Sequence, residues 1–270
     1  MSAADTLPVL LKGLKLPAFA AHFAELAEQA EKQGWSFVDF LRELCELELR
    51  QRKERRVERN LKASNLPADK TLATLEVDRL PERVRRRIPT LCKGGFADRA
   101  DNVLAFGLPG RGKTHLVCAI GHELIHRGYR VLFVPAIVAV QRLLAARRDL
   151  RLEEALRKLD RFDVLILDDL GYIQQDRDEM EVLFTLLSER YERKSVMLTS
   201  NLVFRDWDRI FKDPMTTAAA IDRVVHHSVI LELTGTSYRG DKASERNASR
   251  VSDNYPSPGD DNYTENSDGE

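Results

Sequence analysis

The segment of residues 107–114, GLPGRGKT, constrains the fold of this chain more than any other stretch, because it matches the pattern G-x-x-x-x-G-K-[ST]. An apolar run, 102–106, precedes it, and a helical pattern follows over 113–127. Glycines let consecutive backbone N–H groups turn toward one anion, and the N-terminus of the following helix adds positive potential. The segment therefore predicts a strand, a phosphate-binding loop and a helix in that order.

Two side chains of this loop have predicted roles in binding a nucleotide. Lys113 is expected to reach the β- and γ-phosphates, and the Thr114 hydroxyl group to ligate Mg²⁺. The competing interpretation is a glycine-rich turn with a solvated lysine, and the flanking strand and helix weigh against it. The predicted loop ligands of ATP and Mg²⁺ are Gly107, Leu108, Pro109, Gly110, Arg111, Gly112, Lys113 and Thr114.

From residue 101 onward, apolar runs alternate with helical patterns. We expect strands at 102–106, 130–134, 163–167 and 195–199, and helices at 113–127, from 137 to 144 and at 180–191. Continuous apolar strands that alternate with helices are typical of a parallel sheet covered on both faces. The sequence therefore predicts an α/β fold.

Two aspartates, Asp168 and Asp169, follow the predicted strand 163–167. A carboxylate delivered beside a phosphate loop is what a Mg²⁺–nucleotide site requires, so Asp168 is expected to hold Mg²⁺ through water. Asp169 is expected to orient or deprotonate the attacking water. The alternative is an ordinary acidic turn before Gly171, which the preceding phosphate loop disfavours.

Three polar residues further along the chain are candidates for contacts with the γ-phosphate. Asn201 follows the predicted strand 195–199, where its amide could bond to the γ-phosphate or to the attacking water. Arg223 and Arg239 have the best claim among the arginines to stabilise the charge that develops in phosphoryl transfer. The alternatives are a turn-forming asparagine and surface arginines.

The first part of the chain has two helical patterns. Pro17 suits the first turn of a helix that ends at Gly34, and Ser36 with Asp39 resembles a capping box at the start of a second helix. Their apolar stripes are expected to be packing surfaces. We therefore predict a small all-helical N-terminal domain over 1–66, an ATPase domain over 67–240 and an acidic tail over 241–270.

Two basic segments stand out in an otherwise neutral composition. Seven of the thirteen residues in 50–62 are basic, and a second cluster occupies 83–87. Such segments can neutralise phosphates of duplex DNA, although a solvated helix face is the ordinary alternative. Little aromatic interleaving argues against stacking with single strands. The predicted DNA contacts are Arg50, Arg52, Lys53, Arg55, Arg56, Arg59, Arg83, Arg85, Arg86 and Arg87.

The composition indicates the cellular compartment and the class of protein to expect. Residues 241–270 hold three basic and eight acidic residues, and this tail is predicted to be disordered. Three cysteines without metal-ligand spacing suggest a reducing compartment. The longest apolar run is too short for a membrane span, so we expect a cytoplasmic protein. His226 and His227 lack an acidic or cysteine partner at suitable spacing, which argues against a metal site.

The order of these motifs resembles the AAA+ ATPases, and in detail it resembles the IstB family of transposition helper ATPases, close to the DnaC helicase loaders. The resemblance spans about residues 7–240. It is carried by the phosphate loop with His115 after it and by the segments 165–171, 198–201, 221–223 and 237–239. It departs from general AAA+ proteins in having Asp169 where they carry Glu, and little sequence remains after Arg223 for a helical lid, which is expected to be absent or reduced.

The resemblance implies ATP-dependent DNA binding, homo-oligomers that assemble on duplex DNA and a partner transposase, IstA. It makes Asn201 the sensor-1 residue and Arg223 an arginine finger acting on a neighbouring subunit. His115 and Arg239 join the nucleotide-binding residues, Arg239 in a sensor-2-like role. A DnaC-like helicase loader, a small-molecule kinase and a scaffold that uses ATP only as an assembly switch remain as alternatives, the kinase lacking any recognisable acceptor pocket.

Overall fold

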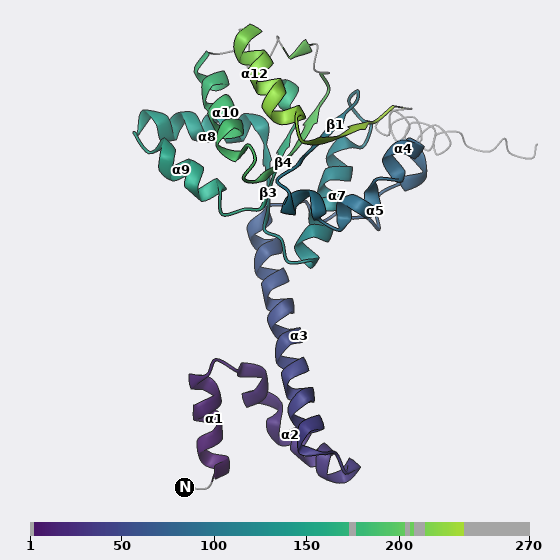
Figure 1. Ribbon diagram of the computed structural model, residues 1–270, viewed down its shortest axis with the longest axis vertical. Coiled ribbons are helices and arrows are strands. Elements are labelled where there is room, and N and C mark those ends of the chain that lie inside the picture. The colour runs from purple at the N-terminus through teal and green to yellow at the C-terminus, as the bar shows by residue number, and fades with distance from the viewer. Residues whose placement is uncertain (1–2, 173–176, 203–205, 208–213, 235–270) are drawn as a thin grey trace, which may run out of the picture.

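The protein is described by a computed structural model covering residues 3–172, 177–202, 206–207 and 214–234. An α/β head stands on one long helix, α3 (Phe37–Ser64), and two further helices, α1 (Ala3–Gly13) and α2 (Pro17–Gln33), lie at the far end of that helix (Figure 1). Arg239 and the predicted acidic tail lie outside the described residues, as does the segment after residue 234 where a reduced lid was expected.

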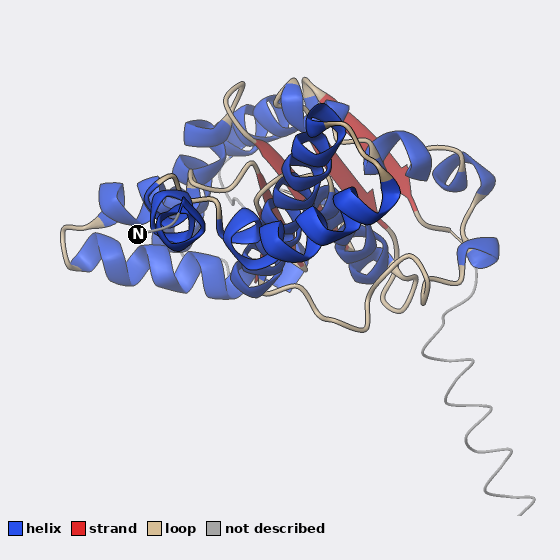
Figure 2. Cartoon of the chain, turned by 90° about the horizontal axis from the view of Figure 1, so that it is seen from below, coloured by secondary structure: helices blue, strands red, loops and turns tan. Residues whose placement is uncertain are grey.

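The head contains a parallel sheet of five strands among the described residues. Its spatial order is β2-β3-β4-β1-β5, and every neighbouring pair is parallel. Figure 2 shows the strands crossing the middle of the head between helices. The strands are β1 (Asn102–Phe106), β2 (Val131–Pro135), β3 (Val164–Asp168), β4 (Ser195–Ser200) and β5 (Ser228–Glu232).

Side chains alternate between two apolar cores, one on each face of the sheet. On β1, Leu104 and Phe106 join the core beneath α8 and α10, whereas Val103 and Ala105 join the core beneath α7. The predicted parallel sheet with helices on both faces is therefore confirmed. The covering helices are α4 (Glu82–Arg85), α5 (Ile88–Cys92), α6 (Gly95–Asp98), α7 (Lys113–His126), α8 (Ala136–Arg148), α9 (Leu152–Leu159), α10 (Arg177–Arg190) and α12 (Pro214–Val225), with 3₁₀ turns η1 (Val77–Arg79) and η2 (Leu170–Tyr172).

The predicted strands agree with the structure to within one residue at each end. The expected helices at 137–144 and 180–191 extend further, to Arg148 in α8 and from Arg177 in α10. Sequence patterns missed α1, α4, α5, α6, α9, α12 and β5. The last of these escaped because β5 lies at the sheet edge, where Ile230 is exposed, and its apolar run is only three residues long, 229–231.

The N-terminal helices begin and end as their local chemistry requires. Pro17 opens α2, and Gly34 ends it with a φ of 65°. The Ser36 side chain accepts a hydrogen bond of 3.1 Å from the Asp39 backbone N–H at the start of α3. The expectation that the apolar stripe of this second helix, Phe37, Phe40, Leu41 and Leu44, is a packing surface was wrong in part, because Phe37 is 94% and Leu41 55% exposed.

A buried carboxylate fastens α2 to α3. Glu48 is 3% exposed, accepts a 2.8 Å hydrogen bond from the Ala18 backbone N–H and a 2.7 Å bond from Arg52 Nε. Burial alone would raise the pKa of Glu48, but these hydrogen bonds and the charge of Arg52 outweigh it and hold the pKa below its usual value. Leu11, Phe19 and Leu44 form the small core beside this pair.

The C-terminal half of α3 packs on the head. Val57 and Leu61 contact the core under α7, and Asn60 Nδ2 donates a 3.2 Å hydrogen bond to the carbonyl of Tyr129. One helix is thus shared between the two predicted domains. The division near residue 66 remains a prediction, and α3 ends at Ser64, just before it.

Candidate functional site

The phosphate loop leaves the sheet at the end of β1 and turns directly into α7. Gly107 has a φ of 155°, and a Cβ at this position would lie 2.4 Å from the carbonyl oxygen of Leu233, so only glycine fits beside the chain that follows β5. Gly112 has a φ of 81° and caps the N-terminus of α7. The N-terminus of α7 therefore opens onto the loop, and the first N–H groups of a helix, which have no acceptor within the helix, favour an anion at such a place.

Lys113 lies at the centre of the loop and is 5% exposed. Its Nζ donates hydrogen bonds of 2.7 Å to the carbonyl of Gly107 and 3.1 Å to that of Leu108. The ammonium group is thereby held over the loop, close to where a bound phosphate would replace these carbonyls as its partner.

The carboxylate of Asp168 lies beside the loop at the end of β3 and accepts three short contacts. Thr114 Oγ1 donates to its two oxygens at 2.9 and 3.1 Å, and Thr199 Oγ1 on β4 donates to Oδ1 at 2.6 Å. Burial raises the pKa of Asp168, and the hydroxyl groups and Lys113 only partly oppose that effect. An oxygen-rich, partly dehydrated group of this kind suits a hard cation such as Mg²⁺.

Thr199 is a site residue that the sequence reasoning missed. Its Oγ1 donates to Asp168 and also accepts a 2.8 Å hydrogen bond from the backbone N–H of Asp169, which has a φ of 58°. Strand pairing of β3 with β4 brings the three residues together. The signal in the sequence was Thr199 itself, a polar residue at the end of an apolar strand. Thr199 follows Leu198, and Leu198 pairs with Leu167, the residue just before the aspartates.

Asn201 lies at the same edge of the sheet, against Gly171. A Cβ on Gly171 would come within 2.0 Å of Asn201 Oδ1, so the glycine makes room for the amide. Among the described residues, Asn201 Oδ1 and Arg111 Nη1 are buried without a hydrogen-bond partner. Because both residues line one cavity, these atoms are placed to bond to a ligand rather than to the protein.

That cavity has a volume of about 220 Å³ and joins the phosphate loop to a segment from the N-terminal side of the head. His115 Nε2 lies 3.1 Å from both the Thr71 carbonyl and Thr74 Oγ1, which fixes this segment beside α7. The sequence reasoning had placed His115 on the nucleotide and had not assigned the segment a role. The cavity is lined by Lys70, Thr74, Leu75, Glu76, Pro109, Gly110, Arg111, Gly112, Lys113, Thr114, His115, Asp169 and Asn201.

Arg223 is not brought to this cavity. It lies at the end of α12, where its guanidinium carbon is 4.6 Å from the centre of the Phe184 ring and Nη1 donates to the Ala219 carbonyl at 3.4 Å. The next element is the start of β5, so Arg223 lies toward the amino edge of the sheet, whereas the phosphate loop lies at the carboxyl edge.

The predicted DNA contacts fall on two separate elements, α3 and the region around α4 (Figure 1). Arg52 is committed to the buried Glu48 and to the Lys15 carbonyl, 2.6 Å away, so it has a structural role that its sequence did not reveal. Arg86 pairs with Glu82 and Arg85 with Asp78. The cations that line an open groove between α1 and α3 are Lys12, Lys15, Arg52, Lys53, Arg55, Arg56, Arg59 and Lys62. Arg50, Arg83 and Arg87 are exposed outside that groove.

The parallel sheet, the glycine-rich loop and the aspartates at the end of β3 together define a nucleotide-binding protein of the AAA+ class. Residues 9–246 match the family described as IstB-like ATP binding protein, and the chain belongs to this family. It is therefore an ATP-binding protein related to those that insertion sequences encode.

Named relatives support this assignment. The chain is 45% identical over 240 residues to an insertion sequence ATP-binding protein of Sinorhizobium fredii, covering 88% of this chain and 80% of the relative. It is 39% identical over 233 residues to the insertion sequence IS21 ATP-binding protein of Pseudomonas aeruginosa, covering 86% and 88%.

Solved structures agree on the fold. AMPPCP-bound DnaA from Aquifex aeolicus superimposes with a TM-score of 0.53 at 20% identity, covering 69% of this chain and 57% of that chain. DnaI gives a TM-score of 0.53 at 21% identity, covering 63% and 96%. Across the described residues, every helix is too short or too polar to cross a lipid bilayer.

Proposed function

We propose that this protein is a Mg²⁺-dependent ATPase that assembles on duplex DNA and assists an IstA-like transposase in capturing target DNA. The observation that carries the ATPase part is the convergence of Lys113, Asp169 and the partnerless amide oxygen of Asn201 around one cavity. The Asp168 carboxylate lies directly behind this lining, bonded to Thr114 Oγ1 at 2.9 Å. The proposed partnership with a transposase is supported by the relatives, which are named as insertion sequence ATP-binding proteins.

Each site residue has a role that its surroundings support. Lys113 and the α7 N-terminus bind the phosphates, and Thr114 with Asp168 would hold Mg²⁺, which neutralises phosphate charge when bound. Asp169 accepts the proton of the attacking water or orients it, and Asn201 orients the γ-phosphate. The shorter Asp169 side chain reaches less far than Glu, which favours slow turnover.

The experiment for these roles is a pair of variants in the full chain. Lys113→Ala should abolish ATP binding by calorimetry, and Asp169→Asn should bind ATP normally but hydrolyse it more slowly. ATP affinity that is unchanged in a folded Lys113→Ala protein contradicts the proposed site.

We propose further that Arg223 acts on the ATP of a neighbouring subunit. It lies toward the opposite edge of the sheet from its own phosphate loop, so only another subunit can bring a loop to it. An arginine finger contributes about 10³–10⁵ in rate. A mixture of Arg223→Ala and Lys113→Ala proteins should regain activity, because mixed interfaces contain one intact loop and one intact arginine. Absence of rescue at every ratio, with both variants assembling, refutes this role.

DNA binding is proposed for the exposed cations of α3 and the α4 region. Arg52 is unsuitable as a probe because its removal takes away a hydrogen-bond partner of the buried Glu48 carboxylate. Replacing Arg50, Lys53 and Arg59 by Ala should flatten the slope of log affinity against log salt by up to about 2.7 on duplexes of unrelated sequence. A matched triple variant on and just after α9, with Arg157, Lys158 and Arg161 replaced, should keep the parent slope. Equal slopes in the parent, the α3 variant and the control variant would mean that DNA binds at a surface other than these three side chains of α3.

The choice of partner needs a separate measurement. ATP hydrolysis with and without duplex DNA, read beside sedimentation, should show stimulation together with assembly. Co-purification with an IstA-like transposase supports the transposition role. Selective binding to a replicative helicase instead would favour the helicase-loader alternative.

A further inference from the structure

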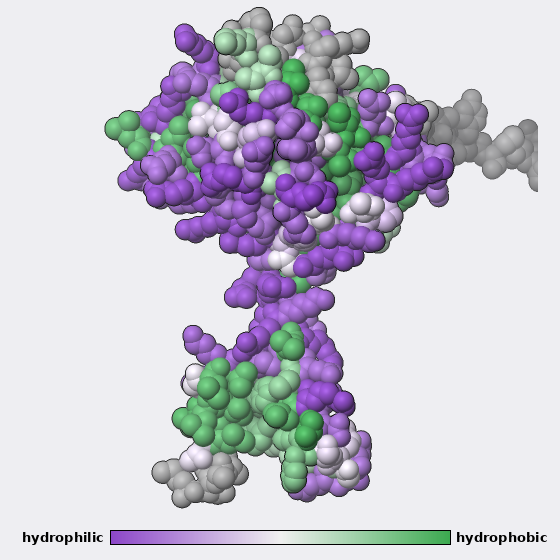
Figure 3. Space-filling model, viewed as in Figure 1, coloured by the Kyte–Doolittle hydropathy of each residue, from purple (hydrophilic) through white to green (hydrophobic). Residues whose placement is uncertain are grey.

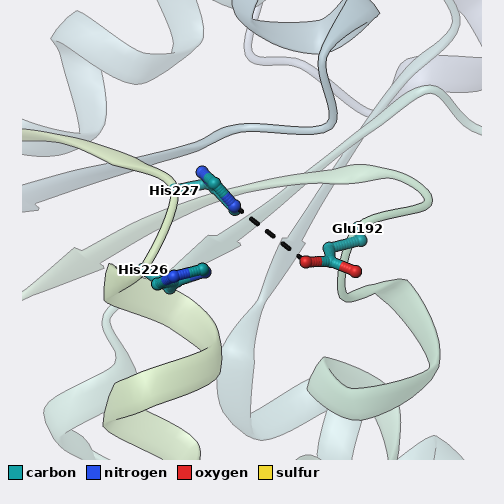
Figure 4. Close-up of side chains that lie close together, drawn as sticks. All are labelled: Glu192, His226 and His227. Atoms are coloured by element: carbon teal, nitrogen blue, oxygen red, sulfur yellow. Dashed lines mark ion pairs between the residues drawn. The ribbon is translucent and has the colours of Figure 1, made fainter.

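Three metal-ligand side chains meet on the head, away from the nucleotide cavity (Figure 4). Glu192 lies in the turn between α10 and β4, and His226 and His227 connect α12 to β5. One ligand atom from each residue lies within 4.8 Å of the others, and His227 Nε2 is 4.0 Å from Glu192 Oε1. The fold thus supplies the acidic partner that local sequence spacing lacked.

Both halves of this cluster are anchored by the surrounding structure. Arg190, which is 1% exposed, donates to the carbonyls of Phe162 at 3.1 Å and Ser195 at 2.9 Å, and this fixes the turn that carries Glu192. The carbonyl of His227 accepts a 2.7 Å hydrogen bond from the Asn102 backbone N–H at the start of β1. The backbone positions of the ligands are therefore set by the sheet and not by the exposed side chains.

Tyr191 orients one of the two imidazoles. Its hydroxyl group lies 3.1 Å from His226 Nδ1, so one ring nitrogen is occupied and Nε2 remains for a ligand. In the tautomer that binds a metal through Nε2, Nδ1–H donates to the Tyr191 oxygen. A hydrogen bond of this kind to the second nitrogen is usual for metal-bound histidine.

We propose that Glu192, His226 and His227 bind Zn²⁺ or a similar divalent transition metal ion. Two imidazoles and one carboxylate are a donor set that this class of ion prefers, and three protein ligands leave a position for water. Zn²⁺ bonds near 2.1 Å in a tetrahedron put neighbouring ligand atoms about 3.4 Å apart. His227 Nε2 and Glu192 Oε1 are 4.0 Å apart, and every pair of ligand atoms lies within 4.8 Å, so binding requires closures of at most about 1.4 Å, which exposed side chains make by rotation.

This site shares no residue with the proposed ATPase mechanism. It lies where β4 and β5 begin, whereas the phosphate loop lies where β1 ends. Metal binding can therefore be measured without nucleotide or DNA, and its failure would leave the proposed function untouched.

The test is calorimetric titration of the untagged full chain with Zn²⁺, supported by Co²⁺ absorption spectra. The parent should bind one ion at the cluster, with the Co²⁺ spectrum of a site containing nitrogen ligands. His226→Ala, His227→Ala and Glu192→Gln should each weaken binding more than about tenfold, and Tyr191→Phe by up to about tenfold.

The matched control is His126→Ala, which removes an exposed histidine at the end of α7. It should bind the metal like the parent. Parent-like affinity in the His226→Ala and His227→Ala variants, or equal loss in the control, overturns the proposal.

Discussion

Replacing Thr199 by Val removes one hydroxyl group that bonds to both aspartates of the site. The hydroxyl donates to Asp168 Oδ1 at 2.6 Å and accepts from the Asp169 N–H at 2.8 Å. Valine keeps the volume of threonine, and position 199 is fully buried in β4, so the backbone of the strand should not move. The substitution therefore tests the two hydrogen bonds of this hydroxyl group, the one to the Asp168 carboxylate and the one from the Asp169 N–H.

The magnitude follows from the charge of the acceptor. A hydrogen bond to a charged group contributes about 1.5–3 kcal/mol, and 1.4 kcal/mol corresponds to a tenfold change in an equilibrium constant. We expect the Mg²⁺ concentration for half-maximal ATP hydrolysis to rise about 10- to 100-fold, as is typical when a partner of a metal ligand is lost. ATP binding without Mg²⁺ should remain close to that of the parent.

The assay is initial ATPase rate against free Mg²⁺ at saturating ATP, with Thr199→Ser as the conservative control. Serine retains the hydroxyl group and should restore most of the Mg²⁺ affinity. Identical Mg²⁺ dependence in the parent, the Val variant and the Ser variant would refute the inference that Thr199 positions Asp168.

Three further predictions test other contacts. Burial raises the pKa of Asp168 in the folded protein, so the free energy of unfolding falls as pH rises from the unfolded pKa through the folded one. At neutral pH without Mg²⁺ the buried charge is therefore destabilising, and Asp168→Asn should melt no lower than the parent. Glu48→Ala should lower the free energy of unfolding of the N-terminal helices by about 2–4 kcal/mol in denaturant titrations, since Ala18 N–H and Arg52 lose their partner. Gly171→Ala should slow ATP hydrolysis without weakening ATP binding, because the added methyl group displaces the Asn201 amide.

Local signals predicted the central part of the head. The strand 102–106, the loop and the start of α7 depend on short-range chemistry that a sequence displays directly, namely glycine conformations and an uninterrupted apolar run. The edge strand β5 gave no such signal because it is only half covered. The helices α9 and α12 did carry local signals, apolar residues at helical spacing over Leu152–Leu159 and a proline at the start of Pro214–Val225, and the sequence interpretation did not use them.

Contacts between distant segments could not be predicted in the same way. Arg52 looked like one more cation on a basic helix, and its bond to Glu48 became meaningful only when packing of α2 buried that carboxylate. The same applies to Glu192, which meets His226 because α10 and α12 pack side by side. Residue type and spacing within one segment do not contain this information.

The apolar surface at the far end of the molecule is a second feature that only the fold could place. Val9, Leu10 and Leu14 are exposed on α1 and just after it, and apolar side chains cover this part of the N-terminal helices (Figure 3). Hydrophobic surface of this kind is costly in water and marks regions that proteins use for contacts.

Because α3 is one continuous helix, the N-terminal helices at its far end move together with any rotation of α3 relative to the head. At 1.5 Å per residue, its 28 residues span about 42 Å, with Glu48 clamping one half and Leu61 seated in the head at the other. A rotation of about 10° where the helix enters the head would move the tip by about 7 Å, given that length. A small rearrangement around the phosphate loop that rotates α3 would therefore displace the N-terminal helices by about the length of a side chain. These helices carry the exposed apolar surface at which another molecule could bind.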